Sequence, residues 1–212
     1  MMNRIVLVMT IGVAGFIAVA SADDKVAADA DRMAVPSPPA RFVPLTGSER
    51  LSQYLTGLAS PETIVKAAAS AGIRQWNGTP KEWGGGAQAY GERVGSAFAQ
   101  HVVESTIQYG LSAALHEDNR YFVSQQAGFL RRTNYAVKST FLARHNDGKR
   151  GFSFSRVGGS AGGAFISRVW QPRSTTSAGD GAVSLGLNMG AAVGFNVVRE
   201  FLPDIKRRFH KK

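Results

Sequence analysis

The stretch VSLGLNMGAAVGFNVV, residues 183–198, carries glycine at every fourth position, at Gly186, Gly190 and Gly194. Leucine, methionine, alanine and valine surround these glycines, which favours a helix over a loop. In a helix, residues four apart lie on the same face, so the three glycines form a smooth stripe. Each glycine inside a helix costs about 1 kcal/mol relative to alanine, and we expect close contact with another helix to offset that loss.

The same spacing recurs in two other segments of the chain. It is common between membrane helices and also occurs in tightly packed water-soluble bundles, so both environments stay open. For VGGSAGGA, residues 157–164, a flexible loop is the alternative to a helix. Gly159 and Gly163 repeat the spacing of their neighbours in that segment. The pattern predicts helix-packing glycines at Gly91, Gly95, Gly158, Gly162, Gly186, Gly190 and Gly194.

Helix-start signals predict an all-α fold, a helical bundle built from long glycine-rich helices. Thr46 and Glu49 have the spacing of a capping box, and Ser60 followed by Pro61 marks a second start. A third start lies at 79–82. Only GFSFS, residues 151–155, alternates as a strand would, and it is isolated. We predict helices over 46–58, 60–76, 87–117, 129–144, 155–170 and 177–202.

The two ends of the chain differ from this helical domain, which we place at residues 46–202. Arg4, an apolar run and Ala20-Ser21-Ala22 predict a signal peptide over 1–22 and hence export; an uncleaved anchor is the alternative. Residues 23–45 are rich in alanine, aspartate and proline, which predicts a disordered tether. Pro203 is expected to kink the chain into a basic tail, 203–212. The chain has no cysteine, which excludes disulfides and thiolate metal sites.

Positive charge is concentrated in the second half of the chain. Residues 23–118 hold 8 basic and 11 acidic residues, whereas residues 119–212 hold 16 basic and 4 acidic ones. Such asymmetry indicates an anionic partner, and in an exported protein we expect a membrane surface rather than nucleic acid. A basic surface that only confers solubility is the alternative. The residues expected to bind the anionic surface are Lys206, Arg207, Arg208, Lys211 and Lys212.

One polar cluster interrupts the apolar pattern, in LHEDNRY at residues 115–121. Successive helix residues point about 100° apart, so His116, Glu117 and Asp118 cannot share a metal while they are helical. We interpret the cluster as a helix C-terminus with a local Asp118–Arg120 salt bridge and with Tyr121 anchoring the turn. His116 would suit the helix dipole there.

A second polar pair lies inside the long helix predicted over 87–117. His101 and Glu104 are three residues apart and share a face, as a general base and its orienting carboxylate would. Their stripe opposes a wide apolar face, so we expect it to be solvated. A hydrolase using His101, Glu104, His116 and Asp118 is the alternative hypothesis. The stripe consists of Ala97, His101, Glu104, Ser105, Gln108, Ser112 and His116.

Two motifs of known chemistries are missing from the sequence. There is no phosphate-binding G-x-x-x-x-G-K-[ST] loop and no H-E-x-x-H, and we predict neither a metal nor a cofactor. The stretches AYGERVGSAF, ALHEDNRYF, RVWQP and REFLPDIKRR resemble a group of exported bacterial proteins with no assigned activity. The resemblance covers roughly residues 80–210, and it implies no catalytic residue.

Together these features predict an exported, envelope-associated helical protein that acts by binding or structure rather than by catalysis. It would bind an anionic membrane surface or associate with itself as a homo-oligomer. A membrane-embedded assembly of glycine-striped helices is a further alternative.

Overall fold

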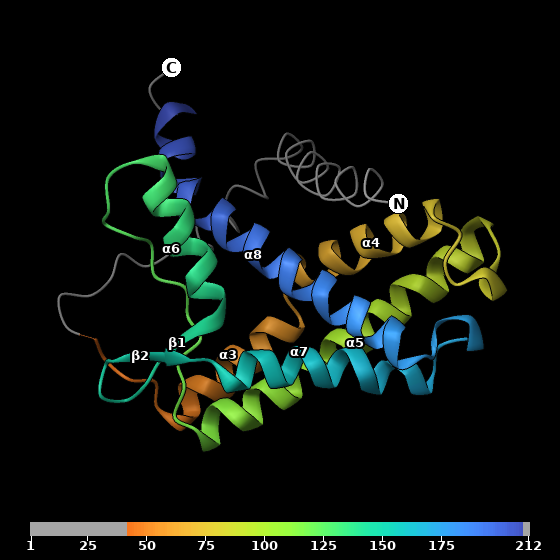
Figure 1. Cartoon of the computed structure of the whole chain (residues 1–212), viewed down its shortest axis with the longest axis horizontal. Helices are drawn as coiled ribbons and strands as arrows, with labels where there is room; N and C mark the ends of the chain where they lie inside the picture. Colours follow the sequence, from red (N-terminus) through yellow and green to blue (C-terminus); the bar gives the residue numbers. More distant parts are fainter. Residues whose placement is uncertain (1–41, 210–212) are drawn as a thin grey trace.

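The computed structural model describes residues 42–209 (Figure 1). Within this range the chain forms six α-helices and one two-stranded sheet, which confirms the predicted all-α class. The predicted signal peptide and most of the tether lie outside the described residues. The helices are α3 (Gly47–Leu58), α4 (Pro61–Trp76), α5 (Gly86–Ala114), α6 (Phe129–Phe141), α7 (Phe154–Ile166) and α8 (Ala178–Phe209), and the strands are β1 (Leu142–Arg144) and β2 (Arg150–Phe152).

The first two helices begin where their capping residues predict. The Thr46 hydroxyl accepts a hydrogen bond from the Glu49 amide, and the Glu49 carboxylate accepts one from the Thr46 amide at 2.8 Å. The Ser60 hydroxyl accepts from the amide of Thr63, and Pro61 occupies the first turn. The third predicted start yields only a short 3₁₀ turn, η1 (Lys81–Trp83), before the long helix α5 begins.

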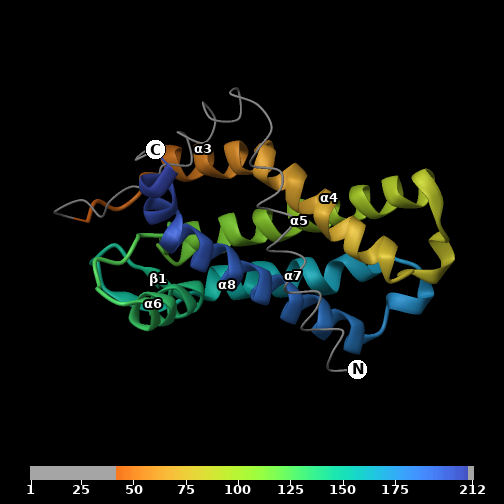
Figure 2. The same ribbon diagram turned by 90° about the horizontal axis from the view of Figure 1, so that it is seen from above.

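Helix α5 is the centre of the arrangement. It contacts α3 and α4 on one side and α7 on the other, while α8 packs across α7 and α6. In Figure 2, α3 lies along the upper edge, and α8 runs diagonally from the lower right to the upper left, packing on α7 on its way. The ring of Tyr54 on α3 stacks on Tyr109 of α5, with ring centroids 4.9 Å apart.

The helix predicted over 129–144 ends three residues early, and that part of the prediction is wrong. Residues 142–144 form β1, which pairs antiparallel with β2 in the register Ala143↔Gly151. The Asp147-Gly148 turn lies between the strands, where Gly148 has a φ of 78°. In addition, the backbone of Asp118 bridges to Arg144 through N–H···O bonds of 2.7 and 3.0 Å. As a strand, residues 142–144 pair their backbone groups with both β2 and Asp118, which a continued helix could not do.

Helix α8 also differs from the prediction, because it continues through Pro203 to Phe209 instead of stopping at residue 202. A proline inside a helix removes one backbone hydrogen bond. Contacts from α6 hold both sides of this position, since the Arg132 guanidinium binds the carboxylates of Glu200 and Asp204. These ion pairs keep the last turns of α8 against α6.

Two further boundaries shift. Helix α5 ends at Ala114 rather than at residue 117, and His116 takes a left-handed φ of 54°. Helix α7 ends at Ile166, and a 3₁₀ turn, η2 (Ser167–Val169), continues from it, with a second one, η3 (Arg173–Thr175), before α8.

The interior of the described chain is polar to an unusual degree. None of its leucine, isoleucine or valine side chains is fully buried, and most of its buried apolar residues are alanines. The largest fully buried side chains include Arg93, Glu117 and Glu200. Arg93 donates hydrogen bonds to five acceptors, four of them backbone carbonyls, so its N–H groups are satisfied without a carboxylate. Large apolar side chains are exposed on all six α-helices.

Candidate functional site

The LHEDNRY segment connects α5 to the rest of the fold through Glu117. Its carboxylate is 1% exposed and accepts hydrogen bonds from the amides of Phe154 and Ser155, at 3.0 and 2.9 Å. The hydroxyl of Ser155 donates a further bond of 2.5 Å, and that of Ser153 one of 3.3 Å. Because these amides begin α7, Glu117 places a negative charge at the positive end of that helix. No local pattern in the sequence predicts this capping role.

The predicted Asp118–Arg120 salt bridge is present, with a closest N···O distance of 2.6 Å. Tyr121 also anchors the segment, as predicted, because its hydroxyl donates to the buried carboxylate of Glu200 at 2.7 Å. Arg132 binds the other oxygen of Glu200 at 2.9 Å. The segment therefore joins α5, α7, α6 and α8 through satisfied polar contacts.

His116 lies apart from these contacts, exposed beyond the end of α5. His101 lies in the middle of α5, thirteen residues before the helix ends, which corresponds to about 20 Å along the axis. Catalytic hydrogen bonds need heavy atoms within about 3 Å. The structure therefore does not bring His101, Glu104, His116 and Asp118 together in one pocket, as the hydrolase hypothesis requires.

Glu104 itself is turned inward, and the expectation of a solvated stripe on α5 is wrong. Its carboxylate accepts a hydrogen bond from the Ser160 hydroxyl of α7 at 2.5 Å, and Asn188 of α8 lies 3.5 Å away. Burial raises the pKa of Glu104, against the lowering effect of the Ser160 bond. Ser112, on the same stripe, is also buried, whereas Phe98 on the opposite face is 39% exposed. Glu104 faces α7 because the glycines there leave it room and Ser160 supplies a hydroxyl donor.

His101 lies beside α4. Its Nε2 is 3.3 Å from the hydroxyls of Thr63 and Ser105. Burial lowers the pKa of His101, and the positive charge of Lys66 lowers it further, while Glu62 acts in the opposite direction. Glu62 forms ion pairs with Lys66 and Arg199, so α4 and α8 meet through charge here.

The glycines of α7 pack directly on α5. A Cβ at Gly159 would lie 2.8 Å from the Glu104 carbonyl oxygen, and one at Gly163 would lie 2.8 Å from Glu104 Cβ. At Gly158 and Gly162, an added Cβ would meet the side chains of Leu111 at 2.7 Å and Ile107 at 2.3 Å. This segment is a helix rather than the loop alternative, and its glycines permit the close approach.

Other predicted helix-packing glycines meet nothing among the described residues. A Cβ at Gly91 or Gly95 of α5, or at Gly186 or Gly194 of α8, would have no atom within 4 Å. Gly190 lies between the last two on the same face and is half-buried. Any close helix contact at Gly186 and Gly194 would therefore have to come from outside the described chain.

Helix α8 turns its polar face inward. Ser184, Asn196 and Glu200 are buried, and Asn196 donates to the Thr140 hydroxyl at 2.8 Å. The opposite face, at 100° per residue, carries the open glycines together with Val183 and Leu187. These two side chains are 63% and 53% exposed. Ordinary amphipathic helices of water-soluble proteins have the reverse arrangement.

The end of α7 lies near the start of α8 (Figure 1), and more apolar side chains are exposed there. A Cβ at Gly181 would lie 2.6 Å from the Phe165 ring, so the two helices touch there. Phe165, Ile166 and Val169 are 44%, 45% and 86% exposed. We call these three residues, together with Val183 and Leu187, the apolar surface. The sequence signal for this surface is the polar residues Ser184, Asn188, Asn196 and Glu200, which are spaced by multiples of four and so share the opposite face of α8.

The basic tail begins inside α8. Lys206 and Arg207 belong to the last turns of the helix, and Arg207 is exposed. The side chain of Arg208 and residues Lys211 and Lys212 lie outside the described part of the chain.

Within residues 42–209, no group of three or more histidine, aspartate or glutamate side chains could hold a metal ion. One described helix, Ala178–Arg207, has the length and composition to cross a membrane, and 22% of its most apolar window is buried. Comparison with protein-family models, curated proteins and solved structures found no match to this chain. The resemblance to exported bacterial proteins therefore stays a prediction.

Proposed function

We propose that this protein is an exported, envelope-associated helical protein that binds a membrane surface and acts by binding or structure rather than by catalysis. One observation carries the proposal: α8 holds its polar residues against the protein and exposes Val183 and Leu187. Removing apolar area from water stabilises the state that hides it, by about 25 cal/mol per Å². A membrane interface would hide the apolar surface.

The charged residues of α8 and of the tail favour a location at the membrane surface over a helix that spans the membrane. A helix that is apolar on one face only lies in the plane of the interface and buries that face among the lipids. Helix α8 carries Arg199 and Glu200 on its protein-facing side, where they pair with Glu62 and Arg132. The basic residues of the tail would add attraction to anionic head groups.

Fractionation of the native cell envelope tests this proposal. We expect the protein to pellet with membranes, to be released partly by high salt and fully by alkaline carbonate. Recovery in the soluble fraction without any wash would contradict membrane binding. Retention after carbonate would instead indicate a spanning helix.

Self-association is a second candidate, and the open glycines of α8 favour it. A Cβ at Gly186 or Gly194 would meet no described atom within 4 Å, so the backbone of a helix from a second copy could approach this face. Sedimentation of purified protein and of the Gly194→Leu variant distinguishes the candidates. A dimer that the variant loses supports self-association, and a monomer in both cases contradicts it.

A further inference from the structure

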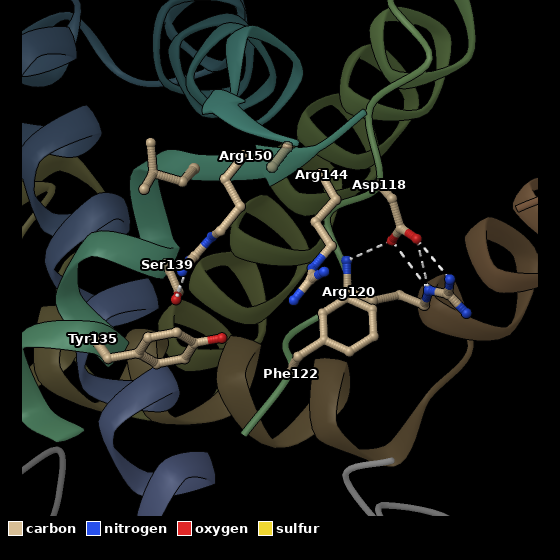
Figure 3. A pocket seen from close by; sticks show the side chains of 9 residues that line it. Asp118, Arg120, Phe122, Tyr135, Ser139, Arg144 and Arg150 are labelled. Atoms are coloured by element: carbon tan, nitrogen blue, oxygen red, sulfur yellow. Dashed lines mark hydrogen bonds and ion pairs between the residues drawn. The ribbon is translucent and has the colours of Figure 1, made fainter. Parts of the chain in front are cut away.

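A pocket beside the β-hairpin is lined by more basic than acidic side chains. Its walls include Arg120, Arg144 and Arg150, with Asp118 as the only acidic residue among the lining side chains. Figure 3 shows these residues around one opening, together with Phe122, Tyr135 and Ser139. The deep part has a volume of about 10 Å³, enough for about one water-sized group.

A wider and more open hollow of about 350 Å³ lies beside the deep part. Phe122, Tyr135 and Arg144 line both, so the two hollows are neighbours. Residues 123–126 form the rest of the outer wall, and they contribute backbone and uncharged polar groups. A ligand group larger than water would lie in the hollow, where it would meet Arg144 and Tyr135, with Arg150 in the narrow part next to them.

Arg144 is the residue that points to a ligand. Its guanidinium packs on the rings of Phe122 and Phe42, at 4.8 and 5.5 Å from their centroids. No described residue accepts a hydrogen bond from this guanidinium, and Figure 3 shows it entering the opening without a partner. Its backbone is fixed by the bridge to Asp118. Aromatic stacking thus orients the side chain while its N–H donors stay available.

The groups around Arg144 add hydrogen-bond donors and do not neutralise its positive charge. Asp118 is 2% exposed and is engaged by Arg120, so it does not neutralise Arg144. Arg150 stacks on Tyr135 at 4.7 Å and donates to the Ser139 hydroxyl at 2.6 Å. The Tyr135 hydroxyl has no hydrogen-bond partner among the described residues and lies beside the same opening (Figure 3).

We propose that Arg144, Arg150 and Tyr135 form a binding site for a phosphate group, carried by a small phosphate ester or by a lipid head group. Arginine forks match phosphate oxygens in pairs, and a phosphate accepts more hydrogen bonds than a carboxylate does. The aromatic walls would contact the apolar part of the ester. The site stands apart from the apolar surface and does not depend on the proposed membrane binding.

Calorimetric titration of the full chain with inorganic phosphate, and separately with soluble short-chain phosphatidylglycerol below its micelle concentration, tests the site. We expect Arg144→Gln to weaken binding about tenfold or more, because it removes charge-assisted hydrogen bonds. Arg131→Gln is the matched control: it removes the same charge from an exposed position on α6 outside the pocket, and we expect a change of less than about twofold. If Arg144→Gln does not fold, Arg150→Gln replaces it with the same expectation.

The outcomes separate the two sources of the phosphate. Binding of inorganic phosphate that depends on Arg144 supports a site for free or small phosphates. Binding of the lipid alone, with the same dependence, supports a head-group site. The inference is overturned if neither probe binds, or if Arg131→Gln weakens binding as much as Arg144→Gln. Membrane fractionation can succeed or fail independently of all these results.

Discussion

Glu117 and Ser155 are joined twice, because the Glu117 carboxylate accepts hydrogen bonds from both the amide and the hydroxyl of Ser155. The two residues lie 38 positions apart in the chain. Through this contact, the segment that follows α5 caps the first turn of α7. Arg50 of α3 adds to the same point by donating to the carbonyl oxygen of Glu117.

The first prediction tests this cap. Glu117→Gln replaces two charged acceptor oxygens with one neutral acceptor and one donor, which leaves buried amides of α7 unsatisfied. We expect a loss of about 2–4 kcal/mol in the free energy of unfolding, measured by urea denaturation. His116→Asn, one residue earlier and exposed, is the control. Asparagine tolerates the left-handed φ there, so its effect should stay below about 0.5 kcal/mol.

The local features of this fold can be predicted from the sequence, whereas the tertiary contacts cannot. The caps at Thr46 and Ser60 and the Asp118–Arg120 pair depend on residues within three positions, so their spacing alone predicts them. The role of Glu117 depends on a partner 38 positions away, which no local pattern reveals.

The prediction that the polar stripe on α5 faces solvent was wrong for a similar reason. The rule that polar faces meet solvent assumes an apolar core. In this chain the helix opposite Glu104 offers Ser160 and glycines, so the polar face is the one that fits. The arginine pocket also required the structure, since Arg120 comes from a different segment than Arg144 and Arg150 of the β-hairpin, and the helix predicted over 129–144 excluded that hairpin.

The second prediction compares two glycines in helices. Gly159→Ala places a Cβ 2.8 Å from the Glu104 carbonyl oxygen, so the helices must separate, and we expect a loss of about 1–3 kcal/mol. Gly95→Ala meets no atom within 4 Å and gains helix propensity, so it should stabilise by up to about 1 kcal/mol. Thermal unfolding of both variants measures the difference. Equal effects of the two changes would argue against the tight α5–α7 contact.

The third prediction concerns pH. The fold holds the pKa of His101 below its ordinary value, chiefly through burial and secondly through Lys66. The folded state therefore binds this proton less readily than the unfolded state does. Its contribution to stability is complete above the unfolded pKa of about 6.5 and is lost as the pH falls through the folded value.

His101→Gln should reduce this loss. We expect urea denaturation between pH 7.5 and pH 5 to show a smaller fall in stability for the variant than for the parent protein. His116→Gln serves as the control, because His116 is exposed beyond the end of α5. An identical pH dependence in His101→Gln and the parent would show that His101 does not couple to folding.

The fourth prediction concerns the basic tail. Neutralising Lys206, Arg207, Arg208, Lys211 and Lys212 should weaken binding to anionic vesicles, because each basic residue near such a surface contributes about 1 kcal/mol. We expect at least a tenfold loss of affinity at low salt and a smaller loss at high salt, measured by vesicle co-sedimentation. Unchanged binding, or no binding by the parent protein, would remove the electrostatic part of the proposal.

The last prediction separates the apolar surface from the charge. Leu187→Glu places a carboxylate on the outer face of α8, where the leucine is 53% exposed and contributes little to the packing of the chain. The folded protein should keep its melting temperature within a few degrees, since substitutions at exposed positions usually have small effects. Insertion among lipids would lose the apolar contact, and we expect vesicle affinity to fall about fivefold or more. Gln53→Glu on α3 adds the same charge at another exposed position and controls for repulsion by anionic lipids. If both variants weaken binding equally, charge alone governs the association, and the outer face of α8 does not enter the membrane.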